Sequence, residues 1–380
     1  MTLVGKNPFV RKQKRQKRKE AEIASQWQLM YWKFIKHKLA LIALPIVTIL
    51  IILALFSEFF APTLPALRHE NYMQAQPNGL RLICVDGNFY LRPFVHGIER
   101  HTDPATFQRV YLPISGVRHE MGFFVRGPEY MMWGIIPGTL RFFGPVEAGA
   151  PFFPMGTDQL GRCLFTRIIH GTRVSMSFAF LSVFFTFILG LTLGGLSGYL
   201  GGIIDMIIQR TIDLVRSIPQ IPLWMALAAA LPRGWDPLMI YFGMVVIMSL
   251  VGWTDLARVV RGKILSIREE DFTMAARLCG ASDARIILKH MLPSFASFII
   301  VVVTMSIPAS VLGETALSFL GLGLQPPVVS WGVLLQDAQT VQALALQPWL
   351  LWPVAFVIIT VLAFNFLGDG LRDAADPYAR

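Results

Sequence analysis

Glu314 is the residue whose type and position most directly suggest chemistry inside a membrane. It follows a run of twenty uncharged residues, 294–313. A carboxylate is costly at membrane depth, so one that stands there is a candidate for a translocation pathway or an outer gate. Alternatively, Glu314 lies at the outer interface, where residues 318–331 (SFLGLGLQPPVVSW) have the prolines of a re-entrant or surface loop. The sequence leaves both placements open.

Motifs for nucleotide or covalent chemistry do not occur in the sequence. Lys6 and Lys263 each follow a glycine, but Asn7 and Ile264 come next, where a phosphate-binding loop has Ser or Thr. Neither the His-Glu-x-x-His of zinc proteases nor the Gly-x-Ser-x-Gly of hydrolases is present. We therefore predict that the chain is not an enzyme and has no catalytic residue of its own.

The three cysteines do not form a metal-binding set, and we predict no metal site. Cys84 and Cys163 both lie in residues 61–170 and could pair in an oxidising compartment. Their separation in space is unknown from the sequence, so this pairing stays open. Cys279 is predicted to be a small apolar packing residue.

A charged, amphipathic insert from Asp271 to Pro293 has the pattern of two short helices joined by a glycine. Gly280 stands where a helix C-terminus needs a residue that tolerates the left-handed conformation. Ser282 can then accept backbone N–H bonds as the N-cap of the second helix. The first helix would carry on one face four apolar positions with i, i+3, i+4, i+7 spacing: Phe272, Ala275, Ala276 and Cys279.

The second helix of this insert repeats the apolar spacing and leads into an apolar segment that begins near Pro293. Its predicted face consists of Ala284, Ile287, Leu288 and Met291. The two helices together indicate a surface that docks into another protein from the cytoplasm.

A stripe of glycines at four-residue intervals marks the second apolar segment: Gly190, Gly194, Gly198 and Gly202. Such a stripe lets helix backbones approach closely in lipid, so helix packing is the favoured interpretation and pore lining the alternative. Four charged residues follow at the inner end: Asp205, Arg210, Asp213 and Arg216. We expect them to pair with one another at helical spacing, and contact with a cytoplasmic partner is the alternative.

The composition places the chain in a membrane. Hydrophobic residues make up 54% of it and charged residues 15%, against about 25% charged in soluble domains. Apolar stretches of about 20 residues fit the thickness of a bilayer. They predict an all-α integral membrane protein with six transmembrane helices, at 39–60, 174–196, 207–231, 237–254, 294–313 and 348–367.

The distribution of basic residues predicts the orientation. Residues 1–38 hold eleven Lys or Arg against two Glu, so this segment should be cytoplasmic and lie on anionic lipid, not on nucleic acid. Six spans then place 255–293 and 368–380 inside and 61–170 outside. The external segment is rich in Pro, Gly and aromatic residues and should form a small lobe, partly of strand, before a five-helix core at 171–367.

Several sequence pieces, in this order, resemble the inner-membrane permease subunits of the oligopeptide/dipeptide ABC importers, of the second-permease type. The similarity covers the first span and residues 155–380. The external segment looks longer than usual for that family. The pieces are GTDQLGR (156–162), SGYLGG (197–202), RGKILSIREEDFTMAARLCGAS (261–282), HMLP (290–293), SFLGLGLQPPVVSWG (318–332) and GDGLRDAADP (368–377).

In that family the cytoplasmic insert is the EAA loop, which seats in a groove of the ATPase subunit. Residues that match its pattern are Ala275, Ala276, Gly280, Leu292 and Pro293, and Ala281 and Ser282 lie beside them. Met274 stands where the pattern has Glu, and His290 stands where Ile is common. A charged contact with the ATPase would then fall to Glu269, Glu270 or Asp271.

The resemblance implies one half of a heterodimeric translocation pathway in the bacterial inner membrane, with both termini cytoplasmic. Its implied partners are a homologous second permease, two ATP-binding cassette subunits, a periplasmic substrate-binding protein and membrane lipid. ATP and Mg²⁺ would bind the ATPase subunits, so no cofactor is expected in this chain. The implied substrate is a di- or oligopeptide, although murein-peptide, nickel-chelate and some sugar importers look alike at this level.

Two other classes of protein remain as alternatives. A secondary transporter would show inverted repeats and paired broken helices, and no convincing repeat is present. A membrane-anchored enzyme would carry a catalytic set in residues 61–170, and that segment shows none.

Overall fold

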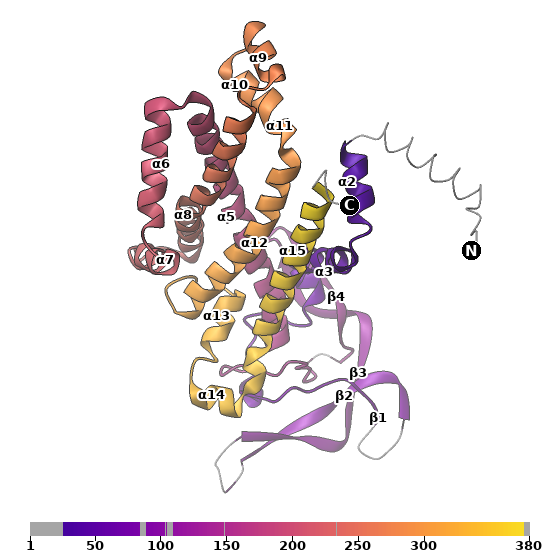
Figure 1. Cartoon of the computed structure of the whole chain (residues 1–380). Helices are drawn as coiled ribbons and strands as arrows, with labels where there is room; N and C mark the ends of the chain where they lie inside the picture. The colour runs from indigo at the N-terminus through magenta and orange to yellow at the C-terminus, as the bar shows by residue number, and fades with distance from the viewer. Residues whose placement is uncertain are drawn as a thin grey trace, which may run out of the picture.

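The computed structural model describes residues 26–83, 89–102, 104, 109–147, 149–232 and 234–375. Cys84 and most of the basic N-terminal segment lie outside the described residues, and so does the proposed pairing of Cys84 with Cys163. The two ends of the molecule differ in kind: a strand lobe lies at one end and the helix α9 at the other (Figure 1).

Five helices in the described part of the chain are long and apolar enough to cross a membrane. They are α3 (Lys38–Leu55), α5 (Leu164–Leu200), α8 (Pro237–Ile267), α12 (Ala296–Phe319) and α15 (Trp352–Ala375), the last preceded by the 3₁₀ turn η3 (Pro348–Leu351). Five of the six predicted spans fall within or overlap these helices.

The third predicted span, 207–231, is wrong as a single helix. The structure has two helices there, α6 (Gly202–Arg216) and α7 (Gln220–Ala229). Pro219 precedes α7 and lacks the N–H that would continue the ladder of α6, so the helix breaks at residues 217–219. At about 1.5 Å per residue, α7 spans about 15 Å, half of the hydrocarbon core.

Two long helices extend beyond their predicted spans. The helix α8 continues to Ile267, so residues 255–267 of the predicted insert are helical and its separate short helices follow them. The helix α5 begins at Leu164, inside the segment that was assigned to the external lobe.

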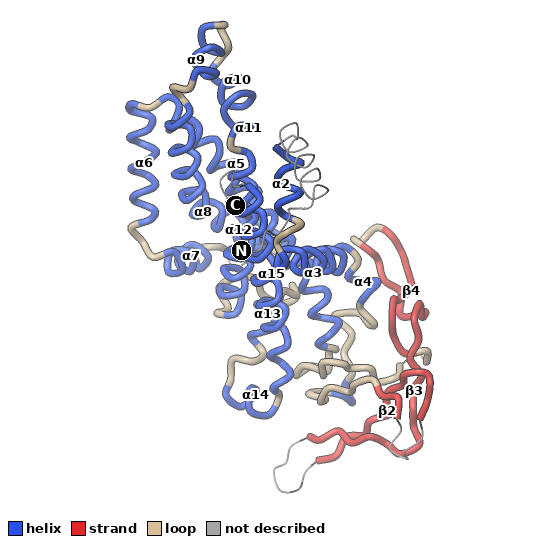
Figure 2. The backbone as a smooth tube through the Cα atoms, turned by 45° about the vertical axis from the view of Figure 1, so that its right-hand side comes forward, coloured by secondary structure: helices blue, strands red, loops and turns tan. Residues whose placement is uncertain are grey.

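The lobe is one antiparallel sheet of four strands in the order β1-β2-β3-β4. Its strands are β1 (Arg81–Ile83), β2 (Phe89–Thr102), β3 (Arg109–Met132) and β4 (Ile136–Pro145). Figure 2 shows them in red at the edge of the molecule, with β4 reaching up beside the short helix α4 (Ser57–Phe60). The all-α fold class therefore describes the membrane part and not this lobe.

Shorter elements connect these parts. They are α2 (Gln26–Phe34), the 3₁₀ turn η1 (Glu70–Tyr72), α13 (Trp331–Gln336) and α14 (Val341–Leu346). A buried apolar cluster joins α3, α5, α12, α13 and α15, with Trp331 fully enclosed in it. This cluster holds the segment after α12 against the long helices.

Candidate functional site

The insert after α8, residues 268–293, forms a separate group of short helices that we call the coupling loop. It contains α9 (Asp271–Leu278), α10 (Asp283–Arg285), the π-helix η2 (Ile286–Met291) and α11 (Leu292–Ser294). Gly280 has a φ of +77°. Its N–H bonds the carbonyl of Arg277 at 3.0 Å, and the N–H of Ala281 bonds the carbonyl of Ala276 at 3.1 Å. This pair of bonds is the Schellman ending of a helix, for which a glycine is favoured.

The helix α9 packs inward through one narrow side. Thr273 is fully buried and its hydroxyl donates to the carbonyl of Ile267 at 2.9 Å, and Ala276 packs against an apolar cluster that includes Ile286 and Met291. The other side of α9 is exposed to solvent and largely apolar: Phe272, Met274, Ala275, Leu278 and Cys279. The predicted packing role of Cys279 is therefore wrong.

We call these five residues the α9 face. Leu278 is the most exposed of them, at 86%, and Phe272 and Met274 are each 43% exposed. Met274, which is not among the four predicted apolar positions of this helix, is as exposed as Phe272. A cluster of exposed apolar side chains of this kind marks an interaction site.

The second half of the coupling loop departs from its predicted α-helical face. Ser282 is the N-cap residue, but its side chain accepts no capping hydrogen bond. The buried positions are Ile286 and Met291, whereas Leu288 is 64% exposed. The cause is the π-helix, whose wider turn brings residues five apart onto one side.

The remaining predicted loop residues are mostly at the surface. Glu269, Asp271 and Pro293 are exposed, and His290 is half-buried. The carboxylate of Glu269 lies 3.9 Å from the guanidinium of its neighbour Arg268. The acidic side chains therefore remain accessible to another protein.

Tyr199, at the C-terminal end of α5, ties the coupling loop to the long helices. Its hydroxyl donates to the carboxylate of Asp283 at 2.7 Å, and the guanidinium of Arg277 lies 5.6 Å from the centre of its ring. The guanidinium of Arg268 donates to the backbone carbonyl of Tyr199 at 3.2 Å. Three residues of the coupling loop therefore contact Tyr199. The SGYLGG motif contains Tyr199, but nothing in the sequence pattern indicated this role.

Ion pairs join α6 to α8 along their facing sides. Asp205 accepts two hydrogen bonds from Arg261, at 2.5 and 2.6 Å, and one from Ser197 at 2.5 Å. The two other pairs are Asp213 with Arg258 and Arg216 with Asp255. The expected pairing within α6 is thus wrong except for Arg210 with Asp213, whose charged atoms lie 3.8 Å apart.

Three glycines of the predicted stripe lie against α8. A Cβ at Gly194 would meet the carbonyl oxygen of Ala257 at 2.5 Å, and one at Gly198 would meet the carbonyl oxygen of Arg261 at 2.9 Å. Gly190 faces the side chain of Leu256 in the same way. Gly202 has open space around it and is not part of this contact. The α5–α8 pair is therefore packed closely along the stripe, with backbone contact at Gly194 and Gly198.

Glu314 is fully buried in α12, inside the protein and not at its outer surface. Its carboxylate accepts hydrogen bonds from the hydroxyls of Ser175 at 3.1 Å and Ser318 at 2.9 Å. Those hydroxyls in turn accept from the backbone N–H groups of Trp331 and Leu324. The carboxylate therefore ties α5 and α12 to the loop that follows α12.

A second buried group of charges lies at the N-terminal end of α5. Asp158 is fully buried and accepts from the backbone of Leu160 and Arg162, each at 2.9 Å, and from the side chains of Arg162 and Arg167. Arg167 also lies 3.6 Å from Asp337. Burial raises the pKa of Asp337, and the charge of Arg167 opposes that rise. This network holds residues 156–162 (GTDQLGR) against the start of α5.

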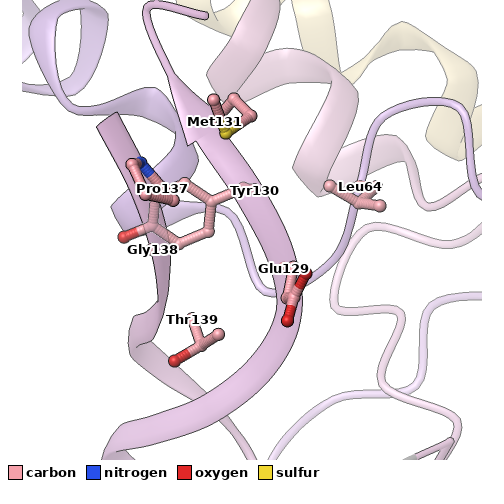
Figure 3. Close-up of a pocket in the computed structure, with 7 residues that line it drawn as sticks. All are labelled: Leu64, Glu129, Tyr130, Met131, Pro137, Gly138 and Thr139. Carbon is pink, nitrogen blue, oxygen red and sulfur yellow. The ribbon is translucent and has the colours of Figure 1, made fainter. Parts of the chain in front are cut away.

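The concave regions in the described part of the chain include one on the lobe and one beside α7. One, of about 620 Å³, lies on the lobe, where Leu64 and residues of β3 and β4 face one space (Figure 3). The other, of about 370 Å³, lies among α7, the start of α8 and the loop after α12, and is lined by Ala228, Ile240, Leu322 and Gln325 among others. Within the described residues no group of His, Cys, Asp or Glu could hold a metal ion.

Comparison with known proteins identifies the family to which this chain is similar. Residues 190–380 match the family described as the binding-protein-dependent transport system inner membrane component. The chain belongs to this family. Residues 25–78 match a second one, the N-terminal transmembrane domain of oligopeptide transport permease C. The chain is therefore a permease component of the inner membrane, with several spans, and not the catalytic subunit of its transporter.

Individual relatives agree with this assignment. The oligopeptide transport system permease protein OppC of Bacillus subtilis is 35% identical over 226 residues, which cover 59% of this chain and 72% of that protein. The dipeptide transport system permease protein DppC of Lactococcus lactis is 31% identical over 348 residues, covering 91% of this chain and 89% of that protein. Among solved structures, a MetNI methionine ABC transporter chain is similar, with 20% identity, a TM-score of 0.45 and coverage of 56% of this chain and 97% of that one.

Proposed function

We propose that this permease forms half of a translocation pathway for di- or oligopeptides and is driven by ATPase subunits that bind its α9 face. The observation that carries the proposal is the exposed apolar surface of α9 on a loop fixed to α5. The α9 face is exposed and can be covered by a partner protein, whereas the other side of α9 already packs against the rest of the chain. The printed functions of the OppC and DppC relatives support peptide as the substrate class.

The sidedness of the molecule supports the proposed topology. The coupling loop and the strand lobe lie at opposite ends (Figure 1), which supports a cytoplasmic position for the first and a periplasmic position for the second. The basic segment at 1–38 favours a cytoplasmic N-terminus. The tail at 368–380 follows α15 and would be on the same side.

The proposed assembly contains four kinds of protein. A binding protein delivers peptide to the outer side, and a homologous second permease completes the pathway. Two ATP-binding cassette subunits hold ATP and Mg²⁺ and contact the coupling loops from the cytoplasm. Apolar side chains exposed on α6, such as Ile203 and Leu214, leave a surface for the second permease or for lipid.

Coupling would work through differential contacts in two states of the assembly. ATP-driven closure of the ATPase subunits moves α9, and the contacts of Tyr199 with Asp283 and Arg277 transmit that movement to α5. The close contact of α5 with α8 at Gly194 and Gly198 makes the two helices move as one body. Glu314 then links α5 and α12 to the outer loop, where an outer gate would lie.

The test is retention of ATPase subunits on affinity-purified permease, together with peptide uptake. Leu278→Glu should weaken ATPase binding, because burial of a leucine contributes roughly 1.5–3 kcal/mol, or on the order of tenfold to a hundredfold in affinity. Leu112→Glu is the matched control, since Leu112 is 49% exposed on the lobe. Equal retention of the ATPase by both variants would exclude the α9 face as the docking surface.

A further inference from the structure

The turn between β3 and β4 carries a concentration of exposed apolar side chains at the outer end of the molecule. The eleven residues 130–140 (YMMWGIIPGTL) contain no charged side chain. Ile135 is 77% exposed and Trp133 is 52% exposed. We call the exposed apolar residues of this turn the hairpin tip: Met131, Trp133, Ile135, Ile136 and Leu140. A patch of this kind needs a partner, because soluble surfaces rarely leave so many large apolar groups together.

The end of α3 fixes the level of the hairpin tip relative to the membrane. The indole N–H of Trp133 donates to the carbonyl of Leu55 at 3.0 Å, and Leu55 is the last residue of α3. The eighteen residues of α3 rise about 27 Å, close to the thickness of the hydrocarbon core. The Trp133 ring therefore lies where that core ends.

A second helix marks the same level independently. The guanidinium of Arg173 lies 4.3 Å from the centre of the Trp133 ring, and it also donates to the carbonyl of Leu55 at 3.1 Å. In α5, Arg173 directly precedes an uncharged stretch from 174 to 204. The apolar parts of α3 and α5 thus begin at one height, and the hairpin tip lies there.

The hairpin is also fixed rigidly at this height. Arg141 is 1% exposed and donates to the carbonyls of Glu58 at 2.6 Å, Ala61 at 2.9 Å and Pro128 at 2.9 Å. These bonds fasten β4 and the bend of β3 to α4. Figure 2 shows the hairpin beside α4 and α3. The hairpin tip therefore needs no rearrangement to be held at the membrane boundary.

We propose that the hairpin tip inserts into the bilayer interface and is a lipid-binding element of this permease. In the orientation proposed above, this is the outer leaflet. Trp is favoured at membrane interfaces, and the neighbouring Ile and Met side chains would reach the acyl chains. Lipid is the occupant that the position favours, because α3 buries only 22% of its apolar stretch, the smallest share of the five long helices. The hairpin thus continues the surface of the most peripheral span.

The experiment measures contact with lipid at two sites of the full chain, reconstituted in phosphatidylcholine nanodiscs with the subunits that copurify with it. Ile135→Cys and Leu112→Cys carry an environment-sensitive fluorophore, in chains whose native cysteines are replaced by alanine. Leu112 is a matched control, because it is an exposed apolar residue of β3 at the far end of the sheet. Brominated acyl chains in the lipid quench a fluorophore that touches them, and iodide quenches one that faces water.

Quenching by brominated lipid should be several-fold stronger at position 135 than at 112, and quenching by iodide should be weaker there. Equal lipid quenching at both sites would overturn the proposal. Shielding of position 135 from both quenchers would also overturn it, since a protein partner would then cover the hairpin tip. A photoreactive phospholipid used on the unaltered chain gives a second reading, and it should label the peptide that contains residues 130–140.

Discussion

The coupling loop and the strand lobe each expose an apolar patch, but they hold their charged and polar side chains in different ways. At the coupling end, α9 turns Phe272 and Leu278 outward, and polar contacts centred on Tyr199 hold the loop from behind. At the outer end, the charged groups Asp158 and Arg141 are buried, and each is bonded to several backbone groups.

This difference has a physical meaning for function. A surface that engages a moving partner needs an apolar face that is free and a hinge that can shift, and the few polar contacts made by Tyr199 meet that need. A buried charge with several hydrogen bonds is expensive to separate from its partners, so the outer junction resists movement. We therefore expect changes at the coupling end to alter coupling, and changes at the outer end to alter stability.

The largest effect is expected in the helix pair that joins the two ends. Gly194→Ala should destabilise the protein, because the new Cβ would meet the carbonyl oxygen of Ala257 at 2.5 Å. Gly195→Ala should stabilise it slightly, because its Cβ would meet only Ile287 at 3.8 Å. Both variants gain the same helix propensity, up to about 1 kcal/mol, so the strain at position 194, about 1–3 kcal/mol, should be the difference between them. Thermal unfolding of both proteins in the same detergent measures this difference, and equal melting temperatures would contradict the close approach.

Local patterns predicted the glycine ending of α9 and the close helix packing well. The position of Gly280 after an amphipathic segment indicates a left-handed residue, and the structure has φ = +77° there. A glycine spacing of four likewise indicated close helix packing, which the structure shows at Gly190, Gly194 and Gly198. Both signals depend on backbone sterics within one or two turns, which a sequence records directly.

Other features depend on partners distant in the sequence. The hydrogen bond between Tyr199 and Asp283 joins residues that are 84 positions apart. The ion pair between Asp205 and Arg261 joins α6 to α8, which α7 separates in the sequence. The π-helix at 286–291 changes the side-chain period, so an α-helical pattern selected Leu288 in place of Ile286. Periodicity alone could not foresee any of these three.

The next largest effect is expected at the tyrosine that fastens the coupling loop. Tyr199→Phe keeps the ring but removes the hydroxyl that donates to Asp283. Loss of a hydrogen bond to a charged group costs about 1.5–3 kcal/mol, so coupling should weaken although the α9 face is intact. We expect the ATPase subunits to remain bound while peptide-stimulated ATP hydrolysis and uptake fall together.

The matched control for this prediction is Tyr111→Phe in the lobe, which removes a hydrogen bond from the hydroxyl to the carbonyl of Met73. It should leave coupling unchanged and cost only about 1 kcal/mol of stability. If both variants reduce uptake equally without a loss of protein, the contrast between the two ends is wrong.

A smaller effect is expected at the helix end of the coupling loop. Gly280→Val places a β-branched residue at positive φ, at a cost of roughly 1–2 kcal/mol or more. Because a Cβ there meets nothing within 4 Å, strain in the backbone is the whole cause. Gly280→Asn is the control, since Asn tolerates this conformation better. Uptake should fall clearly for the Val variant and little for Asn, and normal uptake by the Val variant at normal expression would refute the assignment.

The smallest effect at neutral pH is expected at Glu58, which fastens α4 to α5 at the outer end. Burial alone would raise the pKa of this carboxyl, but hydrogen bonds and the charge of Arg173 lower the pKa below its ordinary value. A depressed pKa in the folded state means that the contribution to stability is present above the unfolded pKa, about 4.3, and is lost as the pH falls through the folded value. Protection of the amides in 130–140, measured as the hydrogen-exchange rate relative to the intrinsic rate at each pH, should therefore stay high from pH 7 to pH 5 and fall only in stronger acid. Glu58→Gln should lower that protection at pH 7 and remove its acid dependence. Loss of protection already between pH 7 and pH 5 in the unaltered chain would show that another group, and not Glu58, controls this junction.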